Sequence, residues 1–455
     1  MKTLLKPLSL AFFIAATLPT QSAYIRTSPP ANTIIPTISP SPHFCKTISG
    51  PENDWGNSLI QTSDGGYAIA GFTESFGAGE ADVYVVKLDA KGNLQWTKTI
   101  GGPYREEGTS LIQTADGGYA IAGVTISFGA GKADVYVVKL DANGNLQWTK
   151  TIGGPKDDLG FSLIQTSDGG YAIAGYTKSF GAGEWDFYVV KLDAKGNLQW
   201  TKTIGGPKDD QGFSLIQTSD GGYVIAGLTE SFGAGNGDVY VVKLDANGHL
   251  QWTKTIGGPA SDMGGSLIQT ADGGYAIAGA TTSFGAGLLD VYVVKLDAKG
   301  NLQWTKTIGG PASEIGNSHA LIQTADGGYA IAGLTQSFGA GEWDVYVVKL
   351  GANGNLQWTT TIGGKKEDVG TSLIQTADGG YAIAGVTISF GAGEWDVYVV
   401  KLDKNGDACC AVSQTSRVGS GGRLGSPTSS IGSGGTLTSP TSRVSSGGTL
   451  TNQCP

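Results

Sequence analysis

The most regular feature of the chain is a set of short apolar runs separated by polar turns. In one copy, residues 162–166 are followed by the turn 167–170, whose glycines can adopt the positive φ of a tight hairpin. Residues 171–175 then predict a returning strand. After a longer loop, residues 186–192 predict a third strand, rich in β-branched and aromatic side chains, and residues 198–204 predict a fourth.

This four-strand pattern recurs with a period of 52 residues. The period is marked by Trp96, Trp148, Trp200, Trp252 and Trp304, and by Trp358 after a two-residue insertion within residues 318–320. Seven Asp-Gly-Gly-Tyr turns begin at Asp64, Asp116, Asp168, Asp220, Asp272, Asp326 and Asp378. A fixed period of this length predicts a repeat architecture with seven units.

Burial on both faces decides which repeat architecture is expected. The third strand of the unit carries Val189 on one face and Tyr188 and Val190 on the other, so each sheet needs a neighbour on both sides. We therefore predict an all-β fold, a seven-bladed β-propeller of four-stranded antiparallel blades. A linear β-solenoid is the alternative, but it needs distinct end caps, which the sequence does not show.

The ends of the repeated region predict how the ring closes. Residues 44–48 align with residues 96–100, a fourth strand, whereas the seventh unit has Cys409 and Cys410 in place of its Gln-Trp pair. We predict that the N-terminal strand 44–48 pairs with residues 396–402 and closes the ring. Cys45 would then lie near Cys409 or Cys410 in a candidate disulfide, and Cys454 could take the remaining thiol.

We predict that the propeller comprises residues 44–412. The segments on either side of it differ from it in amino-acid composition. Residues 1–23 have the layout of a cleavable secretory signal, which predicts a secreted or cell-surface protein, and residues 24–43 form a Pro/Thr/Ser-rich linker. Residues 413–455 form a low-complexity tail rich in Gly, Ser and Thr that repeats every 13 residues. Few large apolar residues make a flexible tail the default expectation, with a small β-array as the alternative.

Charge narrows the range of partners. The formal net charge is −9, so no broad basic face is available for phosphates, and no nucleic acid partner is expected. After signal cleavage no membrane span is expected either. The three histidines, His43, His249 and His319, occupy unrelated positions of the repeat, which gives no pattern for a catalytic or ligand cluster.

Candidate ligand-binding residues lie on the long loops, which share one face of the disc with the Gly-Gly crossovers. The residues before the third strand vary between units and include Trp185, Trp343, Trp395, Leu288 and Leu289. The tryptophans could stack against a sugar or peptide. Alternatively, each covers a neighbouring blade.

One acidic residue precedes every first strand, which gives a second candidate site. These residues are Asp54, Glu106, Asp158, Asp210, Asp262, Glu314 and Asp368. They could form an anionic ring at the channel mouth that holds Ca²⁺. Alternatively, each carboxylate accepts hydrogen bonds from its own loop, and no cofactor is needed.

The unit containing Trp148, the paired glycines 153–154, the acidic pair 157–158 and the strand 186–192 resembles the seven-bladed β-propeller repeat of bacterial extracellular proteins (SBBP-type repeats). The resemblance covers about 365 residues, although Gly-Gly replaces the commoner Gly-Asn of the turn. It implies export and surface-associated or binding roles, and it carries no shared catalytic residues.

These observations favour a non-enzymatic binding, adhesion or interaction scaffold for an extracellular glycan or protein. The alternatives are a propeller enzyme, either a glycan lyase or hydrolase or a quinone-dependent dehydrogenase, and a purely structural surface-layer component.

Overall fold

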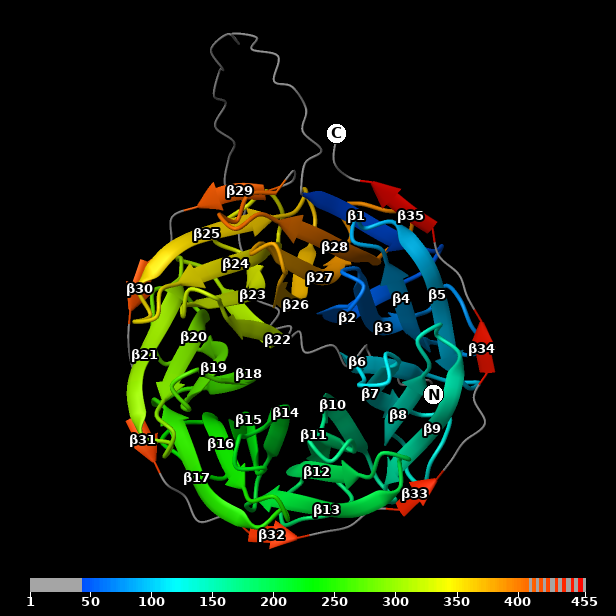
Figure 1. The fold of residues 1–455 in the computed structure, drawn as a ribbon. Helices are drawn as coiled ribbons and strands as arrows, with labels where there is room; N and C mark the ends of the chain where they lie inside the picture. Colours follow the sequence, from blue (N-terminus) through cyan, green and yellow to red (C-terminus); the bar gives the residue numbers. More distant parts are fainter. Residues whose placement is uncertain are drawn as a thin grey trace, which may run out of the picture. The chain divides into compact units, whose positions relative to one another are not determined.

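Seven blades surround a central axis in the computed structural model, which describes residues 43–408 and seven short strands between residues 411 and 452 (Figure 1). These described residues contain strands and turns but no helix. The predicted all-β, seven-bladed propeller of four-stranded antiparallel blades is therefore confirmed.

Each blade contributes four antiparallel strands from the axis outward. The innermost strands are β2 (Asp54–Gln61), β6 (Glu106–Gln113), β10 (Asp158–Gln165), β14 (Asp210–Gln217), β18 (Asp262–Gln269), β22 (Glu314–Gln323) and β26 (Asp368–Gln375). The second strands are β3 (Tyr67–Thr73), β7 (Tyr119–Thr125), β11 (Tyr171–Thr177), β15 (Tyr223–Thr229), β19 (Tyr275–Thr281), β23 (Tyr329–Thr335) and β27 (Tyr381–Thr387).

The two outer positions complete the blade. The third strands are β4 (Asp82–Leu88), β8 (Asp134–Leu140), β12 (Asp186–Leu192), β16 (Asp238–Leu244), β20 (Asp290–Leu296), β24 (Asp344–Leu350) and β28 (Asp396–Leu402). The fourth strands are β5 (Leu94–Gly101), β9 (Leu146–Gly153), β13 (Leu198–Gly205), β17 (Leu250–Gly257), β21 (Leu302–Gly309), β25 (Leu356–Ile362) and the N-terminal β1 (Phe44–Ser49).

Alternation within the second strand explains why the blades stack. In β11, Tyr171 and Ile173 pack with the third strand of their own blade and the alanines of the preceding blade, whereas Ala172 and Ala174 pack against the following blade. A bulky face therefore meets a small-residue face at each junction. All seven residues of β12 are buried, as expected for a sheet covered on both sides.

The ring closes as the repeat alignment predicts. β1 pairs antiparallel with β28 in a register that places Phe44 opposite Lys401 and Ile48 opposite Val397. The seventh blade is therefore built from both ends of the propeller sequence. Cys45 is buried in β1, and the described residues contain no free cysteine. Cys409, Cys410 and Cys454 lie outside the described residues, so the disulfide connectivity stays a prediction.

The tail differs from the expectation of a flexible segment. Its strands are β29 (Ala411–Gln414), β30 (Arg417–Gly419), β31 (Arg423–Gly425), β32 (Ser430–Gly432), β33 (Thr436–Thr438), β34 (Arg443–Ser445) and β35 (Thr449–Asn452). Each adds a fifth strand to one blade rather than stacking on its own copies. The tail has too few apolar residues to form a core of its own. The unpaired N–H and C=O groups at the outer edges of the blades give its strands hydrogen-bonding partners.

Residues 1–42, which comprise the predicted signal (1–23) and all but the last residue of the predicted linker (24–43), lie outside the described residues. Within the described part of the chain, no helix is long and apolar enough to cross a membrane.

Candidate functional site

The long loops and the Gly-Gly crossovers lie together on one face of the disc, here called the long-loop face. The up-and-down order of the strands requires this arrangement, and hydrogen bonds join the two kinds of loop. Glu80 N donates to Tyr104 O at 2.8 Å, and Glu106 N donates to Ala81 O at 2.8 Å. The loop of one blade is thus anchored to the entry of the next.

Trp185 lies half-buried on this face against its own blade. Its ring meets Tyr176 edge-on at 4.7 Å between centroids, and Lys178 Nζ lies 4.3 Å from the ring centre. Tyr176 in turn stacks on Phe161 at 4.9 Å. These contacts support the reading in which a loop tryptophan covers the blades.

The other two candidate tryptophans are half-buried in separate clusters. Trp395 packs on Trp55 of the first blade with ring centroids 5.2 Å apart. Trp343 packs with Leu289 and Val369 around the buried residues Ala280, Ile315 and Leu334. The three tryptophans therefore do not form one platform. Leu288, in contrast, is 70% exposed.

The seven recurrent carboxylates that precede the first strands are all fully buried. Asp158 is typical: its Oδ2 accepts the N–H of Gly154 at 2.6 Å and the hydroxyl of Ser179 at 2.7 Å, and its Oδ1 accepts the hydroxyl of Thr177. Each carboxylate therefore organises its own crossover and long loop, the structural role considered for them in the sequence.

Each of these carboxylates faces a second acid from the preceding blade. A β-carbon placed on Gly153 would overlap Asp134 Oδ1 and would also approach Asp158 Oδ2, so both oxygens turn toward the same α-carbon. The same geometry recurs at Gly101, Gly205, Gly257, Gly309 and Gly363. At the seam Ser49 occupies the glycine position, and Asp396 lies near Asp54. Seven such acid pairs, one per junction, encircle the ring.

Burial raises the pKa of the aspartate that begins the third strand in every pair. Desolvation raises the pKa of Asp134 to about 6 against the lowering effect of the Gly131 N–H, and the nearby Asp158 raises it further. The pKa values of Asp186 and Asp396 are also raised to about 6, mainly by desolvation. Asp134 Oδ1 is buried and has no hydrogen-bond partner among the described residues.

The acid pairs are distributed around the ring rather than gathered at its centre. Among the described residues, no group of three or more His, Cys, Asp or Glu side chains is placed to hold a metal ion. None of the seven acids lines the central cavity. The residues predicted to form an anionic ring therefore belong to the blade junctions, and bound Ca²⁺ stays an untested hypothesis.

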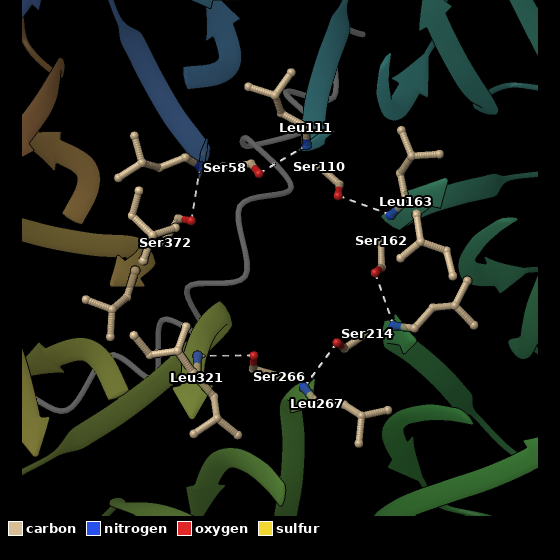
Figure 2. Close-up of a pocket in the computed structure, with 16 residues that line it drawn as sticks. Ser58, Ser110, Leu111, Ser162, Leu163, Ser214, Ser266, Leu267, Leu321 and Ser372 are labelled. Carbon is tan, nitrogen blue, oxygen red and sulfur yellow. Dashed lines mark hydrogen bonds between the residues drawn. The ribbon is translucent and has the colours of Figure 1, made fainter. Parts of the chain in front are cut away.

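The central cavity, of about 230 Å³, is lined instead by leucine, isoleucine and serine side chains of the innermost strands (Figure 2). Six serine hydroxyls link neighbouring blades, each accepting the N–H of the leucine in the next blade at 3.0 to 3.2 Å. The serines are Ser58, Ser110, Ser162, Ser214, Ser266 and Ser372. They form what we call the serine ring.

One position interrupts the serine ring. Ala320 precedes Leu321 in β22, where the other blades have serine, and its methyl group cannot accept the N–H of Leu373. The two-residue insertion widens the bulge of this strand, whose register shifts between Gly316 and Leu321. In the other blades the shift spans only one extra residue, as between Gly264 and Ser266.

A charged cluster that the sequence reading missed lies between the first two blades. Arg105 Nη1 donates to Glu74 Oε1 at 2.9 Å, its Nε donates to Glu107, and its guanidinium lies 4.5 Å from the Phe72 ring centre. The signal was present in the sequence, because no other copy has a basic residue at the position of Arg105 or an acidic residue at the position of Glu107.

The comparison with protein families covers residues 186–446, which match the PQQ_2 model, described as outer membrane protein assembly factor BamB. The chain belongs to this BamB-type family. This family membership supports the assignment of the chain to the propeller repeat proteins. The narrower assignment to the extracellular repeat family stays a prediction.

A curated relative matches part of the chain at low sequence identity. The chain is 27% identical over 214 residues to the regulatory protein FlaEY of Caulobacter vibrioides, covering 41% of this chain and 22% of that protein. It thus spans only about a fifth of that relative's length.

Two solved structures are similar to parts of this BamB-type propeller. Sqt1 from Chaetomium thermophilum is 12% identical with a TM-score of 0.42, covering 74% of this chain and 82% of that one. The NanB sialidase from Streptococcus pneumoniae is 9% identical with a TM-score of 0.40, covering 80% of this chain and 71% of that one.

Proposed function

We propose that the chain is an exported, non-enzymatic scaffold that binds an extracellular glycan or protein through its long-loop face. The binding surface is the inner part of that face, here called the long-loop rim. It comprises the loop residues before each third strand and the crossover residues beside them. The residue after each recurrent acid supports this rim from beneath.

The observation that carries this proposal is where the seven copies differ. The third strand reads Asp-Val-Tyr-Val-Val-Lys-Leu in six copies, with Phe187 replacing one valine in the seventh, whereas the residue after the recurrent acid is different in every copy. It is Trp55, Glu107, Leu159, Gln211, Met263, Ile315 or Val369. Four of these residues, Trp55, Glu107, Leu159 and Ile315, are buried, and the exposed variation lies in the loop residues before the third strand, such as Lys132, Asn236 and Leu288. A repeated framework that carries variable loops on one face is typical of a recognition surface.

The chemistry of the rim changes around the ring. Its exposed part near the fifth blade is apolar, with Leu288 70% exposed beside the half-buried Leu289. Near the first two blades the rim carries Arg105 with its two glutamate partners, and Tyr104 is 54% exposed. A ligand with both an apolar part and a hydrogen-bonding part matches this surface.

The names of the related proteins support a binding role. The family description is that of an assembly factor, and the curated relative is described as a regulatory protein. Neither description names a catalysed reaction. An enzymatic role on a glycan or with a quinone is the alternative, and a direct assay separates it from binding.

The test compares two faces of one blade. The purified chain is applied to glycan and peptide arrays together with Leu288→Ser and, on the opposite face of the same blade, Lys299→Ser; both side chains are exposed. We expect Leu288→Ser to weaken retention about tenfold, as for loss of one apolar contact, and Lys299→Ser to leave it unchanged. Equal loss in both variants, or product formation from an array ligand without retention, would contradict the proposal.

Export is the second part of the proposal and rests on residues 1–23. N-terminal sequencing of the protein recovered outside the expressing cells should begin at Tyr24. An intact Met1 on that material would contradict cleavage.

A further inference from the structure

The tail surrounds the whole propeller in the direction opposite to the blade order (Figure 1). Its strands pair successively with β25, β21, β17, β13, β9, β5 and finally β1. We call the seven strands β29 to β35 the belt. Seven belt strands meet seven outer edges, so each blade edge in the described structure receives one partner.

The register explains the 13-residue period of the tail. In six of the seven belt strands a valine, leucine or isoleucine lies opposite the isoleucine of a fourth strand: Leu437 is paired with Ile152, and Val444 with Ile100. The same pairing joins Val418 to Ile308, Leu424 to Ile256, Ile431 to Ile204 and Leu450 to Ile48. These aliphatic residues follow one another at alternating intervals of six and seven, so one 13-residue repeat serves two blades.

Each belt strand is too short to hold by itself. β30 to β34 have three residues each and pair on one side only. Isolated two-stranded pairs are at best marginally stable in water, whereas linked weak contacts gain from a high effective concentration. The belt is therefore a polyvalent ligand of the propeller, joined to it by the peptide segment that follows β28.

We propose that the seven outer edges form one polyvalent strand-binding surface and that, besides the chain's own tail, it binds the tail of a second copy. The edges offer nearly the same sequence, Thr-Lys-Thr-Ile-Gly in five of the fourth strands. Nothing in backbone pairing with such an edge distinguishes the chain's own belt from another copy's. When the belt of one copy leaves its blade edges, the belt of another copy can pair with them. This exchange of strands between protomers is domain swapping.

The first test keeps the whole chain and cuts only the link. A specific protease site is inserted after Asp407, the folded protein is cleaved under reducing conditions, and a fluorescent peptide of residues 411–453 is added. We expect the cleaved tail to co-elute with the propeller and then to exchange for the labelled peptide. A control peptide with serine at its six aliphatic positions should bind at least about 100-fold more weakly. Immediate separation of the cleaved tail with no peptide binding would overturn the strand-binding surface.

The second test asks whether the partner is another copy. Two uncut preparations with different fluorescent labels are mixed under reducing conditions at increasing concentration, and energy transfer and molar mass are followed. Exchange predicts mixed dimers that disappear in the variant L424S/L437S, because serine removes the aliphatic residues that lie opposite Ile256 and Ile152. If the labelled peptide binds but the full-length chains remain monomeric at every concentration, the second copy is rejected as the partner.

Discussion

Asp134 of one blade and Asp158 of the next turn one carboxylate oxygen each toward the α-carbon of Gly153, and both side chains are buried. Two carboxylates held this close in a buried site cannot both ionise without a large electrostatic cost. The junction therefore favours a proton on one member of the pair. Because the arrangement recurs at every blade, small effects on stability add up around the ring.

Proton uptake by these pairs predicts an unusual pH dependence. The pKa values of Asp134, Asp186 and Asp396 are raised to about 6, so between pH 4 and pH 6 the folded chain holds protons that the unfolded chain has released. The free energy of unfolding should therefore fall as the pH rises through this window.

The opposite trend applies below pH 4. Hydrogen bonds from Thr62 and Lys87 outweigh desolvation and lower the pKa of Asp64 to about 2, and the corresponding turn aspartates of the other blades behave alike. Their contribution is lost as the pH falls toward 2. Calorimetry from pH 2 to pH 8 should place the highest Tm between pH 4 and pH 5, on the order of 5 °C above the value at pH 8. A Tm that rises steadily up to pH 8 would refute the shared-proton junctions.

Neutralising one member of a pair should stabilise the protein at alkaline pH. In Asp134→Asn, the amide oxygen can still accept the N–H of Gly131, while the amide nitrogen can donate toward Asp158. We expect a gain of about 1–2 kcal/mol in unfolding free energy at pH 8, vanishing near pH 4. The matched control is Asp116→Asn in the same blade, which leaves the buried Lys139 without its ion-pair partner at 2.9 Å and should destabilise. Denaturant titrations of both variants at two pH values decide the matter.

The repeat itself made the ring predictable from sequence. The 52-residue period predicts the number of blades, and the apolar residues on both faces of the third strand predict that each sheet is covered on both sides. The isolated copy of the fourth strand at residues 44–48 predicts how the ring closes. Each is a local or periodic property, so it can be read without coordinates. The pairing of residues 44–48 with residues 396–402, which that alignment predicted, is confirmed.

The acid pairs could not be recognised in the same way. Asp134 and Asp158 lie 24 residues apart and begin strands of different blades, so only the packing of one blade on the next brings them to Gly153. Taken one position at a time, the acids suggested a ring around the axis. Their hydrogen bonds to the crossover instead hold them at the blade junctions.

The belt was missed for a related reason. A segment with one aliphatic residue in six or seven has little tendency to fold by itself, and composition therefore favours a flexible tail. Its strands exist because the outer edges offer unpaired backbone groups at a matching spacing. This spacing is set by the distance between neighbouring blades, which only the folded ring defines. The 13-residue period of the tail reflects the spacing only indirectly.

The serine ring should contribute measurably to stability. Ser110→Ala removes the hydroxyl that accepts the N–H of Leu163 at 3.1 Å, and a buried donor without a partner costs about 1–3 kcal/mol. Ser63→Ala, in an exposed turn, serves as the control and should leave the free energy of unfolding unchanged. Guanidinium unfolding of the three proteins measures the difference. Equal stability of all three would show that water replaces the hydroxyl without cost.

The interruption of that ring offers the reverse experiment. Ala320→Ser supplies the seventh acceptor, beside the N–H of Leu373, and should raise the unfolding free energy by about 1 kcal/mol. A loss of stability would mean that the widened bulge of β22 leaves no room for the hydroxyl.

The contact between Trp395 and Trp55 tests whether a loop tryptophan serves the fold. Their rings pack at 5.2 Å across the seam, where the seventh blade meets the first. Trp395→Ala should destabilise the chain by about 1–3 kcal/mol, less than for a fully buried tryptophan because the ring is half-exposed. A double-mutant cycle with Trp55→Ala should give a coupling of about 0.5–1.5 kcal/mol for the ring pair. Coupling near zero, combined with loss of array binding in Trp395→Ala, would instead assign Trp395 to the ligand.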